Sequence, residues 1–394
     1  MNGTIYMPVG EVCSSISDTY REKKNMVTLI NTSDVLEGRV LNHERVPNSN
    51  LKGQFKKTFQ RDDILYSEIR PQNRRFAYVD FSPIDYIAST KLMVIRAKKD
   101  VVSPKYLYYF LKNSSTVAEL QLLAETRSGT FPQITFSEVA NLTIPVPSLA
   151  VQEVIVQTMQ CLEDKITCNE QINDNLEQQA QAIYHERFET VSPNDLPSDW
   201  RIVTLGEVAT ISNKSFNPLK EPEILLEHYS IPAFDEARFP VFELSTSIKS
   251  NKFIIDASCF MISKLNPTTK RVWKPYCLTG NAVCSTEFIV YKAKDQSITD
   301  FLYSVIDSGS FSDFMCSHVT GSTGSRQRTT PSDTLSYELI LPSEDELAEF
   351  QSLVSPMYAQ MRINAIENDK LKRLRDSLLP KLMSGEIDVS AVQL

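Results

Sequence analysis

The chain has 394 residues, of which 42% are hydrophobic and 23% charged, and it carries a formal net charge of −8. This composition is typical of globular proteins and excludes a disordered or collagen-like chain. The length favours two or three domains with cores of useful size. The negative net charge argues against a histone-like protein that simply coats DNA.

The sequence shows neither a targeting signal nor a cysteine motif. No run approaches 18 apolar residues, and the start MNGTIYMPVG lacks the basic and apolar regions of a signal peptide. The seven cysteines are scattered and none form C-x-x-C. We therefore expect reduced thiols in a cytoplasmic protein, with neither a disulfide framework nor a metal site.

Charge is distributed unevenly along the chain. Residues 1–148 hold 19 Lys and Arg against 15 Asp and Glu, whereas residues 149–196 hold 2 against 9. The two later segments, 197–343 and 344–394, are mildly acidic. A basic segment followed by a strongly acidic one indicates modules with different partners.

An internal repeat organises the chain. GEV at 10–12 returns at 206–208, and STKLMVIRAK at 89–98 returns as STEFIVYKAK at 285–294. In each copy a region rich in Val, Ile and aromatics predicts strands. A short amphipathic stretch, a Ser/Gly/Arg segment (126–133 or 320–328), a last strand ending in Pro and a long helix then follow. The chain is therefore two copies of one unit.

Each copy ends in a long helix with a heptad pattern. Apolar residues and asparagines recur at steps of 4 and 3, which is the pattern of a coiled coil. The first seam is Ile155, Met159, Leu162, Ile166, Asn169, Asn173, Leu176, Ala180 and Ile183. The second is Phe350, Val354, Met357, Met361, Asn364, Asn368, Leu371, Arg375 and Leu378. Because Arg375 suits the seam poorly, we expect Leu374 to turn inward beside it.

The two asparagines of each seam lie at its middle, so an antiparallel pair would place centre against centre. Asn169 and Asn173 would then face Asn364 and Asn368, and buried asparagines fix register at a cost in stability. A parallel dimer between two chains is the alternative. The predicted interface of the intramolecular pair is Leu162, Ile166, Asn169, Asn173, Leu176, Met357, Met361, Asn364, Asn368 and Leu371.

The helix pair has a length that suits duplex DNA. A seam from residue 155 to residue 183 spans about 44 Å at ~1.5 Å per residue. At ~3.4 Å per base pair, a spacer of that length separates two readers by about 10 to 13 base pairs. This arrangement suits a split target that is read on one face of the duplex.

Three stretches resemble the specificity subunits of Type I restriction-modification systems. LPSDWRIVTLGEVATI (196–211) resembles the entry to the second target recognition domain of that family. LKRLRDSLLPKLMSGEIDVS (371–390) resembles the end of its second conserved region, and IPVPSLAVQEVIVQTMQCLEDKI (144–166) resembles its first. The resemblance covers nearly the whole chain. One departure is that the first copy begins abruptly and lacks the LP-x-x-W entry.

The resemblance implies an α/β (α+β) fold in which two similar target recognition domains are separated by an antiparallel two-helix coiled coil. The expected segments are recognition domains at 1–148 and 191–343, long helices at 149–190 and 344–386, and a tail at 387–394. Each recognition domain would read one half of a bipartite, asymmetric DNA target, and the helix pair would set the spacing and dock two modification subunits.

The resemblance also implies partners and cofactors. The modification subunits would carry S-adenosylmethionine, and restriction subunits would use ATP and Mg, whereas this chain would bind no cofactor and have no catalytic role. The sequence agrees, since it lacks G-x-x-x-x-G-K-[ST], G-x-G-x-x-G and H-E-x-x-H. Asn266-Pro267-Thr268-Thr269 is interpreted as a turn. The alternatives are the specificity subunit of a fused restriction-methylation system and a coiled-coil scaffold that does not read DNA.

Candidate DNA contacts come from basic segments at equivalent positions of the repeat, because Lys and Arg bind phosphates while Arg, Asn, Gln and Ser also reach base edges. The first pair of segments is basic turns and the second is Ser/Gly/Arg segments; solvated hairpin tips and ordinary loops are the alternatives. The basic-turn candidates are Arg70, Gln72, Asn73, Arg74, Arg75, Lys264, Asn266, Lys270, Arg271 and Lys274. Those of the second pair are Arg127, Ser128, Arg326, Gln327 and Arg328.

Two further groups are less specific. Lys52, Lys56, Lys57 and Arg61 form another basic cluster, for which phosphate contact and mere solvation are equally good interpretations. Trp273 and Tyr276 are interpreted as core residues rather than as platforms for stacked bases.

Overall fold

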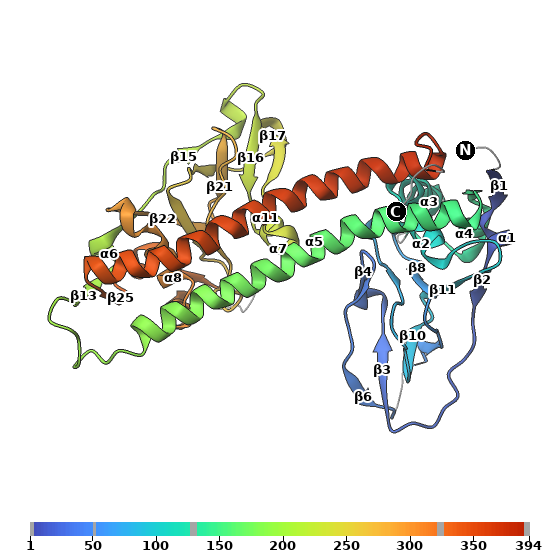
Figure 1. The fold of residues 1–394 in the computed structure, drawn as a ribbon, viewed down its shortest axis with the longest axis horizontal. Helices are drawn as coiled ribbons and strands as arrows, with labels where there is room; N and C mark the ends of the chain where they lie inside the picture. The colour runs from blue at the N-terminus through green and yellow to red at the C-terminus, as the bar shows by residue number, and fades with distance from the viewer. Residues whose placement is uncertain (1–3, 50–52, 127–131, 321–326, 390–394) are drawn as a thin grey trace. The chain divides into compact units, whose positions relative to one another are not determined.

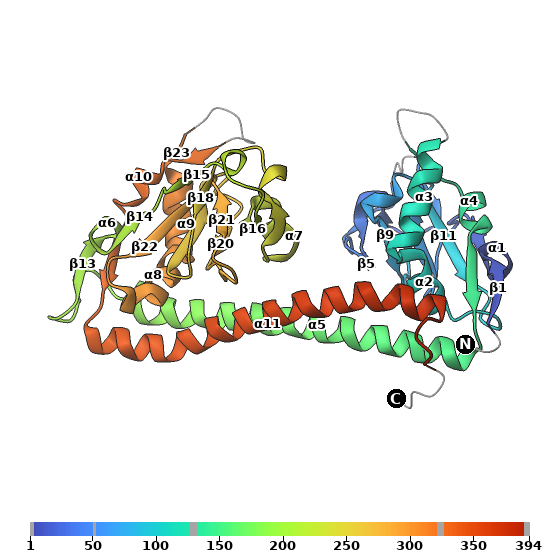
Figure 2. The same cartoon turned by 90° about the horizontal axis from the view of Figure 1, so that it is seen from above.

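The computed structural model describes residues 4–49, 53–126, 132–320 and 327–389 (Figures 1 and 2). The chain divides into two compact units: unit 1 is Met1–Lys165 with Leu371–Leu394, and unit 2 is Ile166–Lys370. Within the described ranges, no helix is both long and apolar enough to cross a membrane.

Unit 1 is built on two four-stranded sheets. The first is antiparallel, and its order is β2 (Cys13–Ile16), β11 (Leu92–Ala97), β8 (Ile64–Ser67) and β9 (Phe76–Tyr78). The order of the second is β6 (Arg45–Pro47), β3 (Met26–Ile30), β10 (Tyr86–Ser89) and β7 (Phe55–Lys57), with β10 parallel to β3. Two small ribbons complete the unit: β1 (Ile5–Pro8) with β12 (Thr143–Val146), and β4 (Val35–Leu36) with β5 (Arg39–Val40).

Unit 2 repeats this plan. Its antiparallel sheet has the order β14 (Ala209–Ile211), β22 (Phe288–Ala293), β19 (Cys259–Ser263) and β20 (Val272–Trp273). Its second sheet has the order β15 (Ser215–Phe216), β18 (Lys252–Ile254), β21 (Ala282–Ser285), β16 (Leu225–Tyr229) and β17 (Val241–Leu244). Again one inner pair, β16 and β21, is parallel. The ribbons are β13 (Arg201–Thr204) with β25 (Glu338–Leu341), and β23 (Val319–Thr320) with β24 (Arg328–Thr329).

The helices have the same order in both units, except that unit 2 has one additional helix between β16 and β17. Unit 1 contains α1 (Val9–Val12), α2 (Pro104–Lys112), α3 (Ser114–Thr126) and α4 (Phe136–Asn141). Unit 2 contains α6 (Leu205–Val208), α7 (Ile231–Ala237), α8 (Thr299–Ile306), α9 (Gly309–Ser317) and α10 (Pro331–Thr334). The matching first sheets, the parallel pair in each second sheet and the four equivalent helices confirm the prediction of two similar α+β domains.

Two long helices, α5 (Leu149–Tyr184) and α11 (Glu344–Ser384), each begin in one unit and end in the other. Each helix contributes apolar side chains to the core of each unit. In unit 1, Ile155 and Met159 of α5 and Leu382 of α11 pack with the α2 residues. In unit 2, Phe350 of α11 packs with the core that contains Tyr184. Residues 379–389 therefore belong to the core of unit 1, including Val389 of the expected tail.

Asparagines join the two helices inside unit 2. Asn169 Nδ2 donates to Asn368 Oδ1 at 2.8 Å, and Asn364 Nδ2 donates to Asn173 Oδ1 at 2.9 Å. Rising numbers on α5 meet falling numbers on α11, so the pair is antiparallel, as the position of the asparagines predicts. Asn169 has no exposed surface and Asn368 has 6%, so these amides need hydrogen-bond partners within the protein.

One prediction about the second seam is wrong. Leu374 does not turn inward, because 45% of its side chain is exposed. Arg375 keeps the seam position, and its guanidinium lies 2.8 Å from Asp376. The nearby charges of Asp376 and Glu163 favour the guanidinium there although burial opposes it. The helix also continues through Pro356 without a break.

Candidate nucleic-acid interface

The basic turn of unit 1 follows β8 and is held in a strained backbone. Arg70 and Arg74 have left-handed φ angles of 44° and 53° and flank the 3-10 turn Pro71–Asn73. Two hydrogen bonds close it, from Asn73 N to Arg70 O at 2.8 Å and from Arg74 N to Pro71 O at 2.9 Å. Each left-handed residue costs about 1 kcal/mol in an L-amino acid. The side chains of Gln72 and Asn73 are exposed at the tip.

The basic turn of unit 2 starts with the same backbone conformation. Asn266 has a φ of 48°, and Thr269 N donates to Asn266 O at 2.8 Å. Asparagine tolerates this conformation well because its short side chain bonds locally. The segment from Asn266 to Thr269 is therefore a turn, as the sequence indicates.

Each basic turn lies beside the Ser/Gly/Arg segment of its own unit. In unit 1, Arg70 N donates to Pro132 O at 3.1 Å. In unit 2, Asn266 N donates to Gln327 O at 2.9 Å. The structure thus brings the two candidate segments of each copy together. Arg127, Ser128 and Arg326 lie outside the described residues, and so does Lys52.

In unit 1 the two cations after the turn contact neighbouring segments. Arg74 Nε lies 3.2 Å from Glu37 Oε1. Arg75 Nη1 donates to the carbonyl oxygens of Ser33 at 3.0 Å and Val35 at 3.4 Å. The guanidinium of Arg75 therefore supports the start of β4. Both acceptors are neutral carbonyl oxygens, so these bonds do not neutralise its positive charge. Arg70 is exposed.

In unit 2 the cations after the turn form ion pairs within the unit. Arg271 makes a two-point pair with Asp235 at 2.6 and 2.8 Å. Lys270 Nζ lies 2.8 Å from Asp307 Oδ1, and Lys274 pairs with Asp300. A paired carboxylate cancels much of the field that a phosphate would feel. These three residues therefore anchor the turn to the body of unit 2, and their role in DNA binding stays a prediction.

The remaining candidates have mixed environments. Arg328 makes a two-point pair with Glu287, both bonds being 3.0 Å. Lys264 and Gln327 are partly buried. Lys57 donates to Leu92 O at 2.8 Å, and burial lowers the pKa of its amine. Lys56 and Arg61 are exposed.

Acidic partners were missed by sequence reasoning. Asp235, Asp300 and Asp307 lie 26 to 37 residues from the cations that they bind, and no local pattern marks them. Asp307 is also notable because burial raises the pKa of its carboxyl to about 6, despite the attraction of Lys270. Gln181 Nε2 donates to its other oxygen at 2.8 Å.

Two aromatic candidates are part of the fold. Trp273 is 3% exposed and packs edge-on against Tyr229, with ring centroids 4.7 Å apart. Its indole is therefore core, as interpreted from the sequence. Tyr276 is partly buried and its hydroxyl donates to Arg238 O at 3.1 Å.

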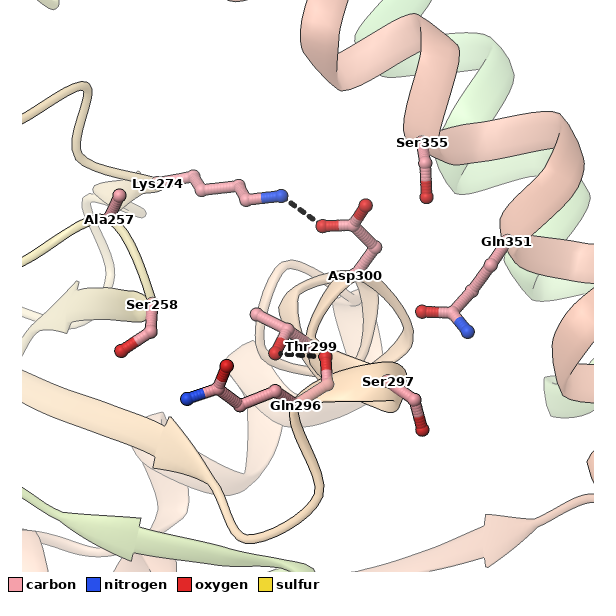
Figure 3. Close-up of a pocket in the computed structure, with 9 residues that line it drawn as sticks. All are labelled: Ala257, Ser258, Lys274, Gln296, Ser297, Thr299, Asp300, Gln351 and Ser355. Carbon is pink, nitrogen blue, oxygen red and sulfur yellow. Dashed lines mark hydrogen bonds and ion pairs between the residues drawn. The ribbon is translucent and has the colours of Figure 1, made fainter.

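A polar hollow of about 520 Å³ lies in unit 2 between α8 and α11 (Figure 3). Its titratable lining residues, Lys274 and Asp300, are paired with each other. The rest of the lining is amide, hydroxyl and methyl groups, from Ala257, Ser258, Gln296, Ser297, Thr299, Gln351 and Ser355. Among the described residues, no group of three His, Cys, Asp or Glu side chains could hold a metal ion.

The chain is similar in sequence to known DNA specificity proteins. Residues 6–178 match the Type I restriction modification DNA specificity domain. The chain is 29% identical to the HindI specificity subunit of Haemophilus influenzae, over 92% of this chain and 94% of that protein. It is 25% identical to the MjaIX specificity subunit of Methanocaldococcus jannaschii, over 78% and 76%.

Solved structures agree on the fold. The S subunit of a Type I restriction-modification system from M. genitalium superimposes with a TM-score of 0.54 at 14% identity, over 97% of both chains. A chain from a study of complex assembly and conformational transition in the Type I system gives 0.50 at 19% identity, over 98% and 99%. Over nearly its whole length, the chain is therefore similar to the specificity subunits of Type I restriction-modification systems.

Proposed function

We propose that each unit of this chain reads one half of a split, asymmetric DNA target and that the chain itself catalyses no reaction. The observation that carries the proposal is the duplicated platform. Both units keep the same four-stranded antiparallel sheet and the same left-handed residue at Arg70 and Asn266, yet they present different side chains there. One scaffold with two sets of side chains suits two different half-sites.

The helix pair is the second part of the proposal. It sets the distance between the half-sites and docks two modification subunits. The acidic composition of residues 149–196, with 2 Lys and Arg against 9 Asp and Glu, supports a protein-binding rather than a DNA-binding role for that segment. DNA contacts then fall to the units.

The chemistry belongs to the partners in this scheme. The modification subunits bind S-adenosylmethionine and methylate adenines that are flipped out of the duplex. Restriction subunits use ATP and Mg for translocation and cleavage. This chain supplies the sequence specificity, and it binds none of these cofactors.

The test is a genome-wide methylation map of the source strain with and without the gene. We expect one split methylated-adenine motif to disappear when the gene is deleted. An unchanged map in a strain that expresses the modification subunits contradicts the proposal. Complementation with the intact gene should restore the motif, which excludes an effect on neighbouring genes.

A further inference from the structure

Three segments meet beside each basic turn. In unit 1 they contribute Glu68, which follows β8, Lys91 between β10 and β11, and Gln133, the last residue of the Ser/Gly/Arg segment. Backbone bonds lock them together: Glu68 N donates to Lys91 O at 3.0 Å, and Ile134 N donates to Glu68 O at 2.9 Å. We call Glu68, Lys91 and Gln133 the unit 1 triad.

Unit 2 contains the same arrangement. Lys264 N donates to Glu287 O at 2.9 Å, and Thr329 N donates to Lys264 O at 3.1 Å. Lys264, Glu287 and Arg328 form the unit 2 triad. The serine that precedes each triad makes the same local bond in both units, from Ile69 N to Ser67 Oγ at 3.0 Å and from Leu265 N to Ser263 Oγ at 3.2 Å.

The side chains on these two equal backbones carry opposite charges. Unit 1 has Glu68 where unit 2 has Lys264, and Lys91 where unit 2 has Glu287. Lys91 Nζ lies 3.3 Å from Glu68 Oε2 and 3.2 Å from Gln133 Oε1. In unit 2 the place of Gln133 is taken by Arg328, which binds Glu287 through Nε and Nη2.

Stability does not explain this reversal. The charged ends are half exposed, with 50% of the Lys91 side chain and 42% of the Arg328 side chain accessible. Surface ion pairs of this kind contribute little to folding, and either polarity would serve equally. Each triad nevertheless has an N–H donor that takes no part in its internal bonds. These donors are the amide nitrogen of Gln133 in unit 1 and Nη1 of Arg328 in unit 2.

Lys, Arg, Gln and Glu are the side chains that distinguish base edges. Arg and Lys bind guanine, Gln binds adenine, and Glu accepts from cytosine. We propose that the two triads are specificity-determining sites for double-stranded DNA: Lys91 with Gln133 selects bases in one half-site, and Arg328 oriented by Glu287 selects bases in the other. This inference rests on the proposed function, since it names the residues by which each unit reads.

The test reverses one triad at a time in the full chain, expressed with its modification subunits, and maps methylated motifs. Glu68→Lys with Lys91→Glu inverts the pair in unit 1, and Lys264→Glu with Glu287→Lys inverts it in unit 2. We expect each variant to change the preferred bases of one half-site by about ten- to a hundredfold and to leave the other half-site unchanged.

A matched control is available in the same unit. Glu22→Lys with Lys24→Glu reverses another exposed pair, 3.8 Å apart, on the segment between β2 and β3. It changes charge placement without touching a triad, so both half-sites should persist. Both triad variants and this control leave the net charge unchanged.

The outcomes separate this inference from the proposed function. Absence of any split motif with the unaltered chain overturns the proposed function. A split motif that survives both triad inversions, or that weakens equally in both halves, overturns the role of the triads. If an inversion abolishes methylation, Lys91→Gln and Glu287→Gln decide instead: relaxed base preference at one half-site supports the role, and an unaltered motif overturns it.

Discussion

Single residues in the basic turns show how far a cluster of cations differs from a free positive surface. Arg75 donates from its guanidinium to the carbonyl groups of Ser33 and Val35, whereas Arg271 donates from Nε and Nη2 to the carboxylate of Asp235. The first arrangement leaves a net positive charge at the turn, and the second does not. Phosphate binding should therefore depend more on the turn of unit 1.

Replacing Arg74 and Arg75 together by alanine should weaken DNA binding and flatten its dependence on salt. Each phosphate contact that is lost removes about 0.9 from the slope of log K against log salt, so we expect a change of roughly 1–2. Binding titrations at several salt concentrations measure it. Arg187→Ala, which removes a cation paired with Glu349 at 3.0 Å, is the control. An unchanged slope in the double variant removes this turn from the interface.

Asp307 should make the stability of unit 2 depend on pH. Burial raises the pKa of its carboxyl from 3.8 to about 6, so the folded state binds the proton more tightly than the unfolded chain does. The free energy of unfolding should therefore fall as the pH rises from about 4 to above 6. Asp307→Asn has no proton to lose, and it should gain up to about 3 kcal/mol over the wild type across this range.

Tryptophan fluorescence measures this effect in unit 2 alone, because both tryptophans, Trp200 and Trp273, lie there. Denaturation would be compared at several pH values. A difference between Asp307→Asn and the wild type that stays constant with pH contradicts the prediction. Lys270→Met removes the attraction that lowers the pKa of Asp307, and it should move the window to higher pH.

At the scale of elements, the helix pair uses buried amides as well as apolar side chains. Asn169 also donates to Glu367 Oε2 at 2.7 Å, and Asn368 donates to Ile166 O at 3.3 Å. A slide of one helix along the other would break these bonds and leave amides buried without partners. The asparagines therefore select one register, although leucines would bury more apolar area.

Asn169→Leu alone should lower the free energy of unfolding of unit 2 by about 1–3 kcal/mol, because Asn368 loses its donor in a buried place. Asn169→Leu with Asn368→Leu should recover part of that loss. A double-mutant cycle followed by tryptophan fluorescence gives the coupling energy. Asn175→Leu on the exposed face of α5 serves as a control. Strictly additive effects would show that the two asparagines do not depend on each other.

At the scale of the whole molecule, the last residues of the chain belong to the same unit as the first. Leu379, Leu382, Met383 and Val389 are buried in the core of unit 1 together with Val9 and Val12. Truncation after Lys370 removes all four, and each large buried side chain contributes about 2–5 kcal/mol. That sum, about 8–20 kcal/mol, is as large as the whole stability of a typical domain, about 5–15 kcal/mol.

We therefore expect truncation after Lys370 to unfold unit 1, to abolish assembly with modification subunits, and to leave unit 2 folded. Limited proteolysis should cut within 1–165, while tryptophan fluorescence still reports a cooperative transition. Truncation after Val389 keeps the buried side chains and should behave as the full chain. A protease-resistant unit 1 in the shorter form would contradict the role of this segment.

Lengthening both helices should lengthen the gap in the target. Seven residues inserted after Asn173 and seven before Asn364 preserve the heptad phase and keep both asparagine layers paired. At ~1.5 Å per residue this adds about 10 Å, or about 3 base pairs. Methylation mapping of the variant gives the new gap. A gap of the original length would contradict the role of the helices as a spacer.

Local and repeated features were predictable from the sequence. The duplication, the long helices, the antiparallel pairing and the turn at Asn266 depend on periodicity and on residues close together in the chain, which the sequence shows directly. Asn169 faces Asn368 because both lie at the middle of their seams. The prediction that Leu374 turns inward was wrong, because the negative charges of Asp376 and Glu163 stabilise Arg375 at the seam position.

Periodicity in the sequence was enough to predict two similar units and two paired helices. The folded structure was needed to show which cations are neutralised, that each basic turn meets its Ser/Gly/Arg segment, and that 379–389 complete the core of unit 1. The physical reason is distance along the chain. Partners such as Arg271 and Asp235, or Val12 and Leu382, meet only after the sheets and helices have packed, and no local pattern encodes that encounter.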